Sequence, residues 1–281
     1  MTRLTFHLLR VGHCKHPECV AMRGGSWRSV EFPALCGLML HPVRGWMLFD
    51  TGYSDHFLQA TDRLPEKIYR WVTPYTLPPG QTLYAQLEAL GIRPADIACV
   101  LISHLHGDHI AGLKDFPRAR FIALRAEYDS MRARSRIGGL MHAFLPALLP
   151  ADFTDRVDFA DDLPALRLQS ELAPFDSGFD LFGDRSVIAI PLPGHSRGQM
   201  GIAFRGQDDR LIFMVADACW TRKALADGQG PTWLASRIFD SGAAYARTFS
   251  DLRQLAARAQ GPMLVPSHCE TSWKALRNEP A

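Results

Sequence analysis

The chain has 281 residues, 47% of them hydrophobic, and a formal net charge of +2 at pH 7. This length and composition provide a sizeable core for one large or two small globular domains. The near-neutral charge gives no argument for nucleic acid or a membrane surface as a partner. No apolar run reaches the roughly 20 residues that a membrane-spanning helix needs.

The N-terminal residues and the cysteines both bear on the cellular compartment. His7 and Arg10 interrupt the apolar residues at the start of the chain, so we expect no signal peptide and predict a cytoplasmic protein. The six cysteines form no Cys-x-x-Cys pair, which favours free thiols. Residues 13–19 hold two histidines and two cysteines, but no second pair at zinc-finger spacing follows, and we interpret them as a polar loop.

The first half of the chain alternates predicted strands with turns and helices. Apolar runs bounded by turn residues predict strands over residues 5–9, 33–40, 46–49, 98–102 and 119–124. Residues 53–80, rich in aromatic side chains and proline, are expected to be irregular, as a lid or a surface excursion. Helices are predicted over 82–90, from Ile110 onward, and over 126–134, the last with its Arg and Glu side chains in solvent.

The second half repeats this order of strands first and a helix later. Its strands are predicted over residues 187–191, 200–205, 211–216 and 263–266. A helix capped by Asp240 or Ser241 extends to about Gln260 with one apolar face. Periodicity is weak around 135–184, which connects the halves or covers a site. We therefore predict one α/β domain over 1–281, a four-layer αβ/βα sandwich of two similar halves with helices outside.

The strongest functional signal is the sequence Ser-His-Leu-His-Gly-Asp-His at 103–109, directly after the predicted strand 98–102. It places four metal-ligand types, His104, His106, Asp108 and His109, within six residues. Neutral imidazoles and a carboxylate suit Zn²⁺, Fe²⁺ or Mn²⁺. From an extended loop the two residues His104 and His106 can point the same way, whereas the adjacent Asp108 and His109 diverge. One loop can therefore serve two metal ions.

Two tetrahedral ions need about eight ligand bonds, some of them from water, so further protein ligands are expected elsewhere. Three candidates share one context, a ligand-type residue directly after a predicted strand: His195, Asp217 and His268. Strand ends on one rim of a sandwich would bring these positions to the same place.

Charge and geometry assign the ligands to two metals. His104, His106 and His195 would hold the first metal, and Asp108, His109 and His268 the second. Asp217 would place one oxygen on each metal, and a hydroxide would be shared between them.

Two carboxylates have further predicted roles. Asp108 could protonate the leaving oxygen when the substrate bond breaks. Asp50, at the end of the strand 46–49, could accept a hydrogen bond from a ligating imidazole and fix its tautomer, or simply form a turn.

These residues together resemble the metallo-β-lactamase-fold hydrolase superfamily. The resemblance rests on the motif 103–109, Asp50-Thr51-Gly52, Pro193-Gly194-His195-Ser196, Asp217 and His268. Within the superfamily the chain is most similar to the N-acyl-homoserine lactone lactonases, through Gly12-His13-Cys14, Cys36 and the sequence Leu-Pro-Gly-His-Ser-Arg-Gly-Gln at 192–199. The resemblance implies hydrolysis of a small, acyl-bearing lactone or ester with two divalent metal ions, most often zinc, with iron or manganese as alternatives.

One position departs from the lactonase pattern. The lactonases carry a tyrosine three residues after the bridging aspartate, and this chain has Trp220 there. An indole donates one hydrogen bond and accepts none, so Trp220 is expected to line an acyl pocket or to pack in the core.

Other functions stay open at this point. They are a mononuclear iron enzyme similar to the persulfide dioxygenases, a phosphodiester or thioester hydrolase of the same fold, and a binding protein that keeps metals for folding or sensing. The oligomeric state is left open, a homodimer included.

Overall fold

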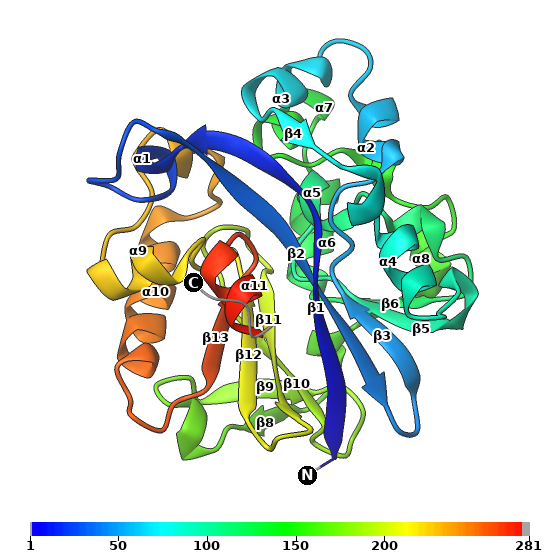
Figure 1. Cartoon of the computed structure of the whole chain (residues 1–281), viewed down its shortest axis with the longest axis vertical. Coiled ribbons are helices and arrows are strands. Elements are labelled where there is room, and N and C mark those ends of the chain that lie inside the picture. Colours follow the sequence, from blue (N-terminus) through cyan, green and yellow to red (C-terminus); the bar gives the residue numbers. More distant parts are fainter. Residues whose placement is uncertain (1, 277–281) are drawn as a thin grey trace.

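Two β-sheets pack face to face in the computed structural model of this chain, which describes residues 2–276 (Figure 1). The pairing of Arg3 with Arg205 links the strands of both sheets into one 13-stranded arrangement. Helices lie on the outer faces of the sheets, and the predicted four-layer α/β sandwich is confirmed. Among the described residues, no helix is both long and apolar enough to span a membrane.

The first sheet has the strand order β7-β6-β5-β3-β2-β1, and β4 pairs with β1. Its strands are β1 (Arg3–Pro17), β2 (Ser29–His41), β3 (Gly45–Phe49), β4 (Tyr75–Thr76), β5 (Ile97–Leu101), β6 (Arg120–Ala123) and β7 (Val157–Phe159).

The second sheet has the order β8-β9-β10-β11-β12-β13. Its strands are β8 (Ala165–Arg167), β9 (Ser177–Asp180), β10 (Val187–Pro191), β11 (Met200–Gly206), β12 (Leu211–Ala216) and β13 (Met263–Pro266).

The α-helices are mostly short and connect the strands. They are α1 (Glu18–Ala21), α2 (Asp55–Ala60), α3 (Lys67–Val72), α4 (Leu83–Ala89), α5 (Gly107–Ile110), α6 (Arg125–Arg132), α7 (Arg136–Met141), α8 (Phe153–Arg156), α9 (Arg222–Asp227), α10 (Gly242–Ala256) and α11 (Glu270–Leu276).

Three hydrophobic clusters separate the four layers. The central cluster joins Met47 of the first sheet to Ile202 of the second. Val100 of β5 lies in the outer cluster under α4, while its neighbour Leu101 lies in the central one, because successive strand side chains point to opposite faces. A strand covered on both faces reads as a continuous apolar run, which is why β5 could be predicted from the sequence.

The two sheets are also joined by backbone hydrogen bonds at one end of the sandwich. The amide of Leu35 donates to the carbonyl of Ser267 at 2.9 Å, and the amide of Met200 donates to the carbonyl of Ser103 at 2.9 Å. Both bonds lie beside the ends of strands after which the sequence predicts ligands. These bonds hold the loops of both halves together at that end.

Two elements differ from the sequence prediction in the first half. Strand β1 extends to Pro17 rather than ending near residue 9, because its pairing with β2 continues past an irregular step between Arg10 and His13. Residues 53–80 contain helices α2 and α3 instead of being irregular. The hydroxyl of Ser54 caps α2 by accepting from the amide of His56, and Phe57 and Tyr69 pack edge to face beneath these helices.

Helix boundaries differ as well. The short helix expected to open at Ile110 instead ends there, so Asp108 and His109 are helical residues of α5. The long C-terminal helix is capped by Ser241, whose hydroxyl accepts from the amide of Ala244, but it ends at Ala256 instead of near residue 260. The six cysteines are free thiols, as predicted.

Candidate metal centre

The predicted ligand motif follows β5 and continues into α5, next to the backbone hydrogen bond between Met200 and Ser103 that joins the sheets. His104, His106 and His109 are at most 3% exposed. Thr51 anchors the helical part, because its amide and its hydroxyl both donate to the carbonyl of His109, at 2.8 and 2.9 Å. Burial and these hydrogen bonds hold the imidazoles in place.

Asp50 supports the ligand motif through contacts with Ser103 and His109. Its Oδ1 accepts the amide of Ser103 at 2.8 Å, and its Oδ2 accepts the hydroxyl of Ser103 at 2.8 Å and lies 2.8 Å from Nδ1 of His109. An ionised carboxylate only accepts, so Nδ1 of His109 carries the proton and Nε2 is left to point into the site. The contact expected of Asp50 is therefore present.

Glu127 is a second buried carboxylate, which the sequence prediction placed in solvent. It is 0% exposed. Its Oε1 accepts the amide of Leu105 at 2.9 Å, and its Oε2 accepts the hydroxyl of Ser196 and, at 3.0 Å, the amide of Gly198. A Cβ at Gly198 would lie 2.2 Å from the backbone nitrogen of Glu127, so only glycine allows this approach. Glu127 thus connects the loop of His104 and His106 to the loop of His195.

No feature of the sequence distinguishes Glu127 from an exposed helical residue. It stands in the segment Arg-Ala-Glu-Tyr at 125–128, which has the pattern of a solvent-facing first helical turn. Burial raises its pKa, against the opposing effect of its hydrogen bonds from Ser196, Leu105 and Gly198. Its role emerges only when the two loops are placed beside it.

The second half supplies three single residues, each just after a strand end. His195 follows β10, Asp217 follows β12 and His268 follows β13, and all three are at most 8% exposed. Nδ1 of His268 donates to the carbonyl of Pro33 at 2.8 Å, which turns its Nε2 toward the site. The turn before His195 requires Gly194, whose φ is +135° and whose added Cβ would lie 2.2 Å from the amide of Tyr245.

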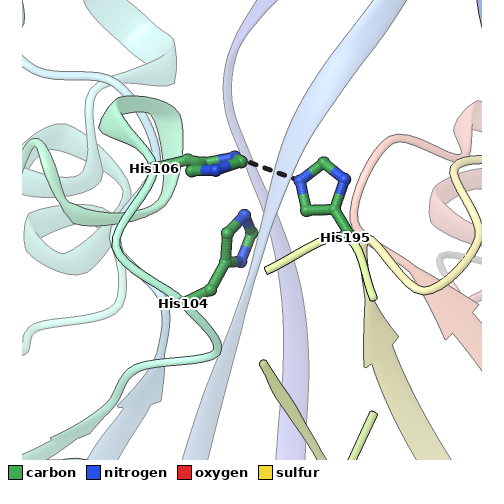
Figure 2. Close-up of side chains that lie close together, drawn as sticks. All are labelled: His104, His106 and His195. Atoms are coloured by element: carbon green, nitrogen blue, oxygen red, sulfur yellow. Dashed lines mark hydrogen bonds between the residues drawn. The ribbon is translucent and has the colours of Figure 1, made fainter. Parts of the chain in front are cut away.

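All seven predicted residues come together. Ligand atoms within 4.8 Å of one another form three groups that share members: His104, His106 and His195; His104, His109 and Asp217; and Asp108, His109 and His268. Figure 2 shows the first group, with Nε2 of His195 3.0 Å from Nδ1 of His106 and the ring of His104 beside them. Seven ligand-type side chains from four loops therefore surround one small volume.

Asp217 lies between the groups. Its Oδ1 is 3.4 Å from Nε2 of His109, and its Oδ2 is 3.3 Å from Nε2 of His195 and 3.2 Å from Nε2 of His268. Asp108 lies at the edge, with Oδ2 3.6 Å from Nε2 of His268. One carboxylate thus faces both groups of imidazoles.

The imidazoles differ in their affinity for protons. Burial, together with neighbouring imidazoles, lowers the pKa of His104 and of His106 well below its ordinary value and that of His195 to about 4. Burial also opposes a charge on His109, but Asp217, Asp108 and Asp50 outweigh it and raise its pKa. Neutral imidazole is the form that binds a metal, so the first group consists of ready ligands.

The residues fit divalent metal ions. Within residues 2–276, five buried nitrogen and oxygen atoms of these residues have no hydrogen-bond partner: Nε2 of His104, His106 and His109, Nδ1 of His195, and Oδ1 of Asp217. Buried polar atoms are normally paired, and these unpaired atoms all belong to residues of one cluster. Nitrogen and carboxylate donors at this spacing are the donor set of Zn²⁺ and similar ions.

Trp220 lies directly against this cluster. Its Nε1 donates to Oδ2 of Asp217 at 3.0 Å. Its ring centroid is 6.0 Å from that of His195 and 6.1 Å from that of Phe239. The single hydrogen bond that an indole can donate is therefore used on the carboxylate at the centre of the site.

Comparison with known proteins agrees with this arrangement. The profile of the family described as "Metallo-beta-lactamase superfamily" matches residues 30–214. The chain belongs to the metallo-beta-lactamase superfamily. Its relatives include the N-acyl homoserine lactonase AttM of Azorhizobium caulinodans, 30% identical over 100% of this chain and 98% of the relative. The lactonase AiiB of Agrobacterium fabrum is 27% identical over 82% of this chain and 78% of the relative.

Solved structures of this superfamily share the fold. An N-acyl homoserine lactone hydrolase with N-hexanoyl-L-homoserine at its catalytic metal centre has a TM-score of 0.70 at 17% identity, with 98% of this chain and 97% of that chain covered. AidC, a dizinc quorum-quenching lactonase, has a TM-score of 0.65 at 16% identity, with 96% and 89% covered. The chain is thus an enzyme of the metal-dependent hydrolase type, with lactonases among its relatives.

Proposed function

We propose that this protein opens the ring of an acyl-bearing lactone with two divalent metal ions, for which zinc suits the ligand set best. The observation that carries this proposal is the convergence of seven ligand-type side chains around Asp217. The lactonase activity for which the relatives AttM and AiiB are named supports the lactone as the substrate class.

The ligands divide between the two ions as follows. His104, His106 and His195 hold one ion, and Asp108, His109 and His268 hold the other. Asp217 would contribute to holding both ions, because its Oδ1 faces Nε2 of His109 at 3.4 Å and its Oδ2 faces Nε2 of His195 at 3.3 Å and Nε2 of His268 at 3.2 Å. Bound ions of this kind polarise a carbonyl and lower the pKa of a water molecule, which supplies the nucleophile.

Asp108 is the group that we assign to proton transfer. Its side chain is 14% exposed, more than that of His109 or His268, so it is the ligand nearest to solvent in its group. A water molecule that attacks the acyl carbon loses a proton, which the Asp108 carboxylate can take up at the edge of the site. The same group can pass this proton to the ring oxygen when the bond between that oxygen and the acyl carbon breaks.

Trp220 has a different task from a substrate hydrogen-bond donor. Because its N–H is bonded to Asp217, it orients the shared carboxylate, and its ring forms an apolar wall beside His195. An apolar acyl group can pack against such a wall.

The test is a substrate panel with the metal-loaded protein. The panel contains N-acyl-homoserine lactones of several chain lengths, a simple lactone, a linear ester, a thioester and a phosphodiester, and mass spectrometry identifies the products. We expect hydroxy acids from the lactones and two metal ions per chain by elemental analysis. Hydrolysis of the phosphodiester or thioester without lactone opening would reject the proposal, as would one iron per chain with oxygen uptake.

A further inference from the structure

Four segments form a continuous surface around the metal centre, which we call the collar: residues 18–28, 62–72, 132–142 and 222–240. In Figure 1 they include α1 and α9 at the left of the view and α3 and α7 near the top. The amide of Arg23 donates to the carbonyl of Gly230 at 3.0 Å, which joins the first segment to the fourth. Arg136 pairs with Glu66 at 2.6 Å, which joins the third to the second.

Further contacts join the third segment of the collar to the fourth and join the collar to the loops that carry the ligands. Nδ1 of His142 lies 2.9 Å from the carbonyl of Ile238, which joins the third segment to the fourth. The amide of Asp240 donates to the carbonyl of His195 at 3.2 Å. On the other side, Gly107 of the ligand motif donates its amide to the carbonyl of Ala143 at 3.0 Å. The collar therefore borders the metal centre directly.

Exposed apolar side chains concentrate in the collar. Its 52 residues, fewer than a fifth of the 281, contain nine of the 14 large hydrophobic side chains exposed within the described residues. Trp27, Trp71 and Trp233 are 86%, 61% and 71% exposed, and Met141 is 66% exposed. Such a concentration of exposed apolar side chains in neighbouring segments is typical of an interaction surface.

The collar is also the basic part of the protein. It holds 11 Lys and Arg residues and five Asp and Glu residues, a net formal charge of +6. The rest of the chain holds the other 20 basic and 24 acidic residues, a net charge of −4. Arg23, Arg28, Arg63 and Arg237 are exposed, and none of them forms an ion pair with a residue in 2–276. These exposed guanidinium groups, unpaired with any carboxylate among the described residues, can attract an anionic surface.

We propose that the collar docks on an anionic lipid bilayer, with the mouth of the metal centre facing the membrane. Tryptophan and aliphatic side chains interspersed with Lys and Arg are the composition of surfaces that lie in the membrane interface. A second copy of the chain fits less well, because a symmetric contact would bring two surfaces of charge +6 together. The average charge of +2 conceals this asymmetry, which is why the composition gave no argument for a membrane.

The test is co-sedimentation of the full-length, metal-loaded protein with vesicles. Vesicles of phosphatidylcholine alone are compared with vesicles of phosphatidylcholine and phosphatidylglycerol, at low and high salt. We expect binding to the anionic vesicles only, weakened by salt. Vesicle binding is measured without turnover, so its result is independent of whether the protein is a lactonase.

Two pairs of variants locate the surface, each with a matched control. Arg63→Glu with Arg237→Glu should weaken anionic-vesicle binding on the order of 100-fold. Arg118→Glu with Arg167→Glu changes the net charge equally at exposed positions outside the collar and should weaken it far less. Trp71→Ala with Trp233→Ala should weaken binding about tenfold, against little change for Tyr84→Ala with Leu90→Ala.

Thermal unfolding of each variant shows whether it is folded. One collar pair changes charge and the other removes apolar side chains, so each tests the surface in a different way. No binding to anionic vesicles, or equal losses for collar and control variants, would overturn the proposal. Concentration-dependent dimerisation that the collar variants abolish, without vesicle binding, would assign the surface to a second copy of the chain instead.

Discussion

The two halves of the molecule contribute to the metal centre in different ways. The first half supplies four ligand-type residues from one stretch, 104–109, and supports them with the side chains of Asp50 and Glu127. The second half supplies His195, Asp217 and His268 singly from three strand ends, and the carbonyl of Pro33 orients the last of these. The dense motif is thus supported by side chains of its own half. Each scattered ligand is placed by a strand end and held by one contact from elsewhere: Glu127 on the loop of His195, Trp220 on Asp217 and Pro33 on His268.

The largest expected effect comes from the residue that connects both halves. Asp217→Asn keeps the shape of the side chain but removes its charge, and we expect kcat/KM for lactone opening to fall on the order of 1000-fold or more, with loss of bound metal. Elemental analysis and kinetics measure both. Asp184→Asn, in a turn remote from the site, is the matched control and should keep full metal content. Normal metal content and normal turnover in Asp217→Asn would show that Asp217 does not connect the ligands of the two halves.

Asp50 tests whether the first half needs its supporting side chains. Asp50→Asn keeps one acceptor oxygen, which cannot accept from the Ser103 amide and from Nδ1 of His109 at once, so the tautomer of His109 is no longer fixed. We expect metal affinity or kcat/KM to fall about 10- to 100-fold, the usual effect of losing a carboxylate behind a ligating imidazole. Isothermal titration with Zn²⁺ measures the affinity. Unchanged affinity for Zn²⁺ would mean that the backbone positions the ligands of the first half without the help of Asp50.

Glu127 tests the connection between the ligand loops. Glu127→Ala leaves two buried amides, those of Leu105 and Gly198, without their acceptor. We expect a loss of about 3 kcal/mol in the free energy of unfolding and a severalfold loss of kcat/KM. Glu127→Gln keeps one oxygen acceptor and should lose less of both. Urea unfolding and kinetics of the two variants provide the measurements, and equal, small losses would contradict the role.

Trp220 is expected to have a smaller effect. Trp220→Phe removes the hydrogen bond to Asp217 but keeps an aromatic wall, and kcat/KM should fall about threefold to tenfold. Trp46→Phe, in β3, is the matched control because it changes a partly buried tryptophan away from the site. If kcat/KM falls no more in Trp220→Phe than in this control, Trp220 has no role in orienting Asp217.

The smallest effect concerns pH. Burial raises the pKa of Glu127 above its ordinary value of 4.5. A carboxyl group with a pKa raised by folding makes its full contribution to stability at pH values below the pKa of the unfolded state. That contribution is lost as the pH rises through the pKa of the folded state. The unfolding free energy of the wild type relative to Glu127→Gln should therefore decrease as pH rises from about 4.5. Urea unfolding across that range measures it, and an increase would contradict the sign.

The sequence predicts the parts of the site that have a local pattern. His104, His106, Asp108 and His109 stand at fixed offsets after an apolar strand, and each later ligand follows an apolar run. Glu127 has no such pattern, because its burial comes from a loop 70 residues away in the chain. Helices α2 and α3 were missed because each has only six residues, and packing rather than periodicity stabilises them.

The charge of the collar could not be predicted either, since it comes from four segments that only the fold brings together. Averaging over the whole chain cancels its excess of basic residues. Patterns confined to one element are thus visible in the sequence, and patterns made by assembly are not.

The two backbone hydrogen bonds between the sheets have a mechanical consequence. They lie one residue from His268 and one residue from His104, respectively. The pairing of Arg3 with Arg205 joins the sheets at the opposite end as well, so the sandwich is bonded through its backbone at both ends. Separation of the layers would have to break backbone pairing at one of these ends. The spacing between ligands of the two halves is therefore set by backbone hydrogen bonds next to His104 and His268.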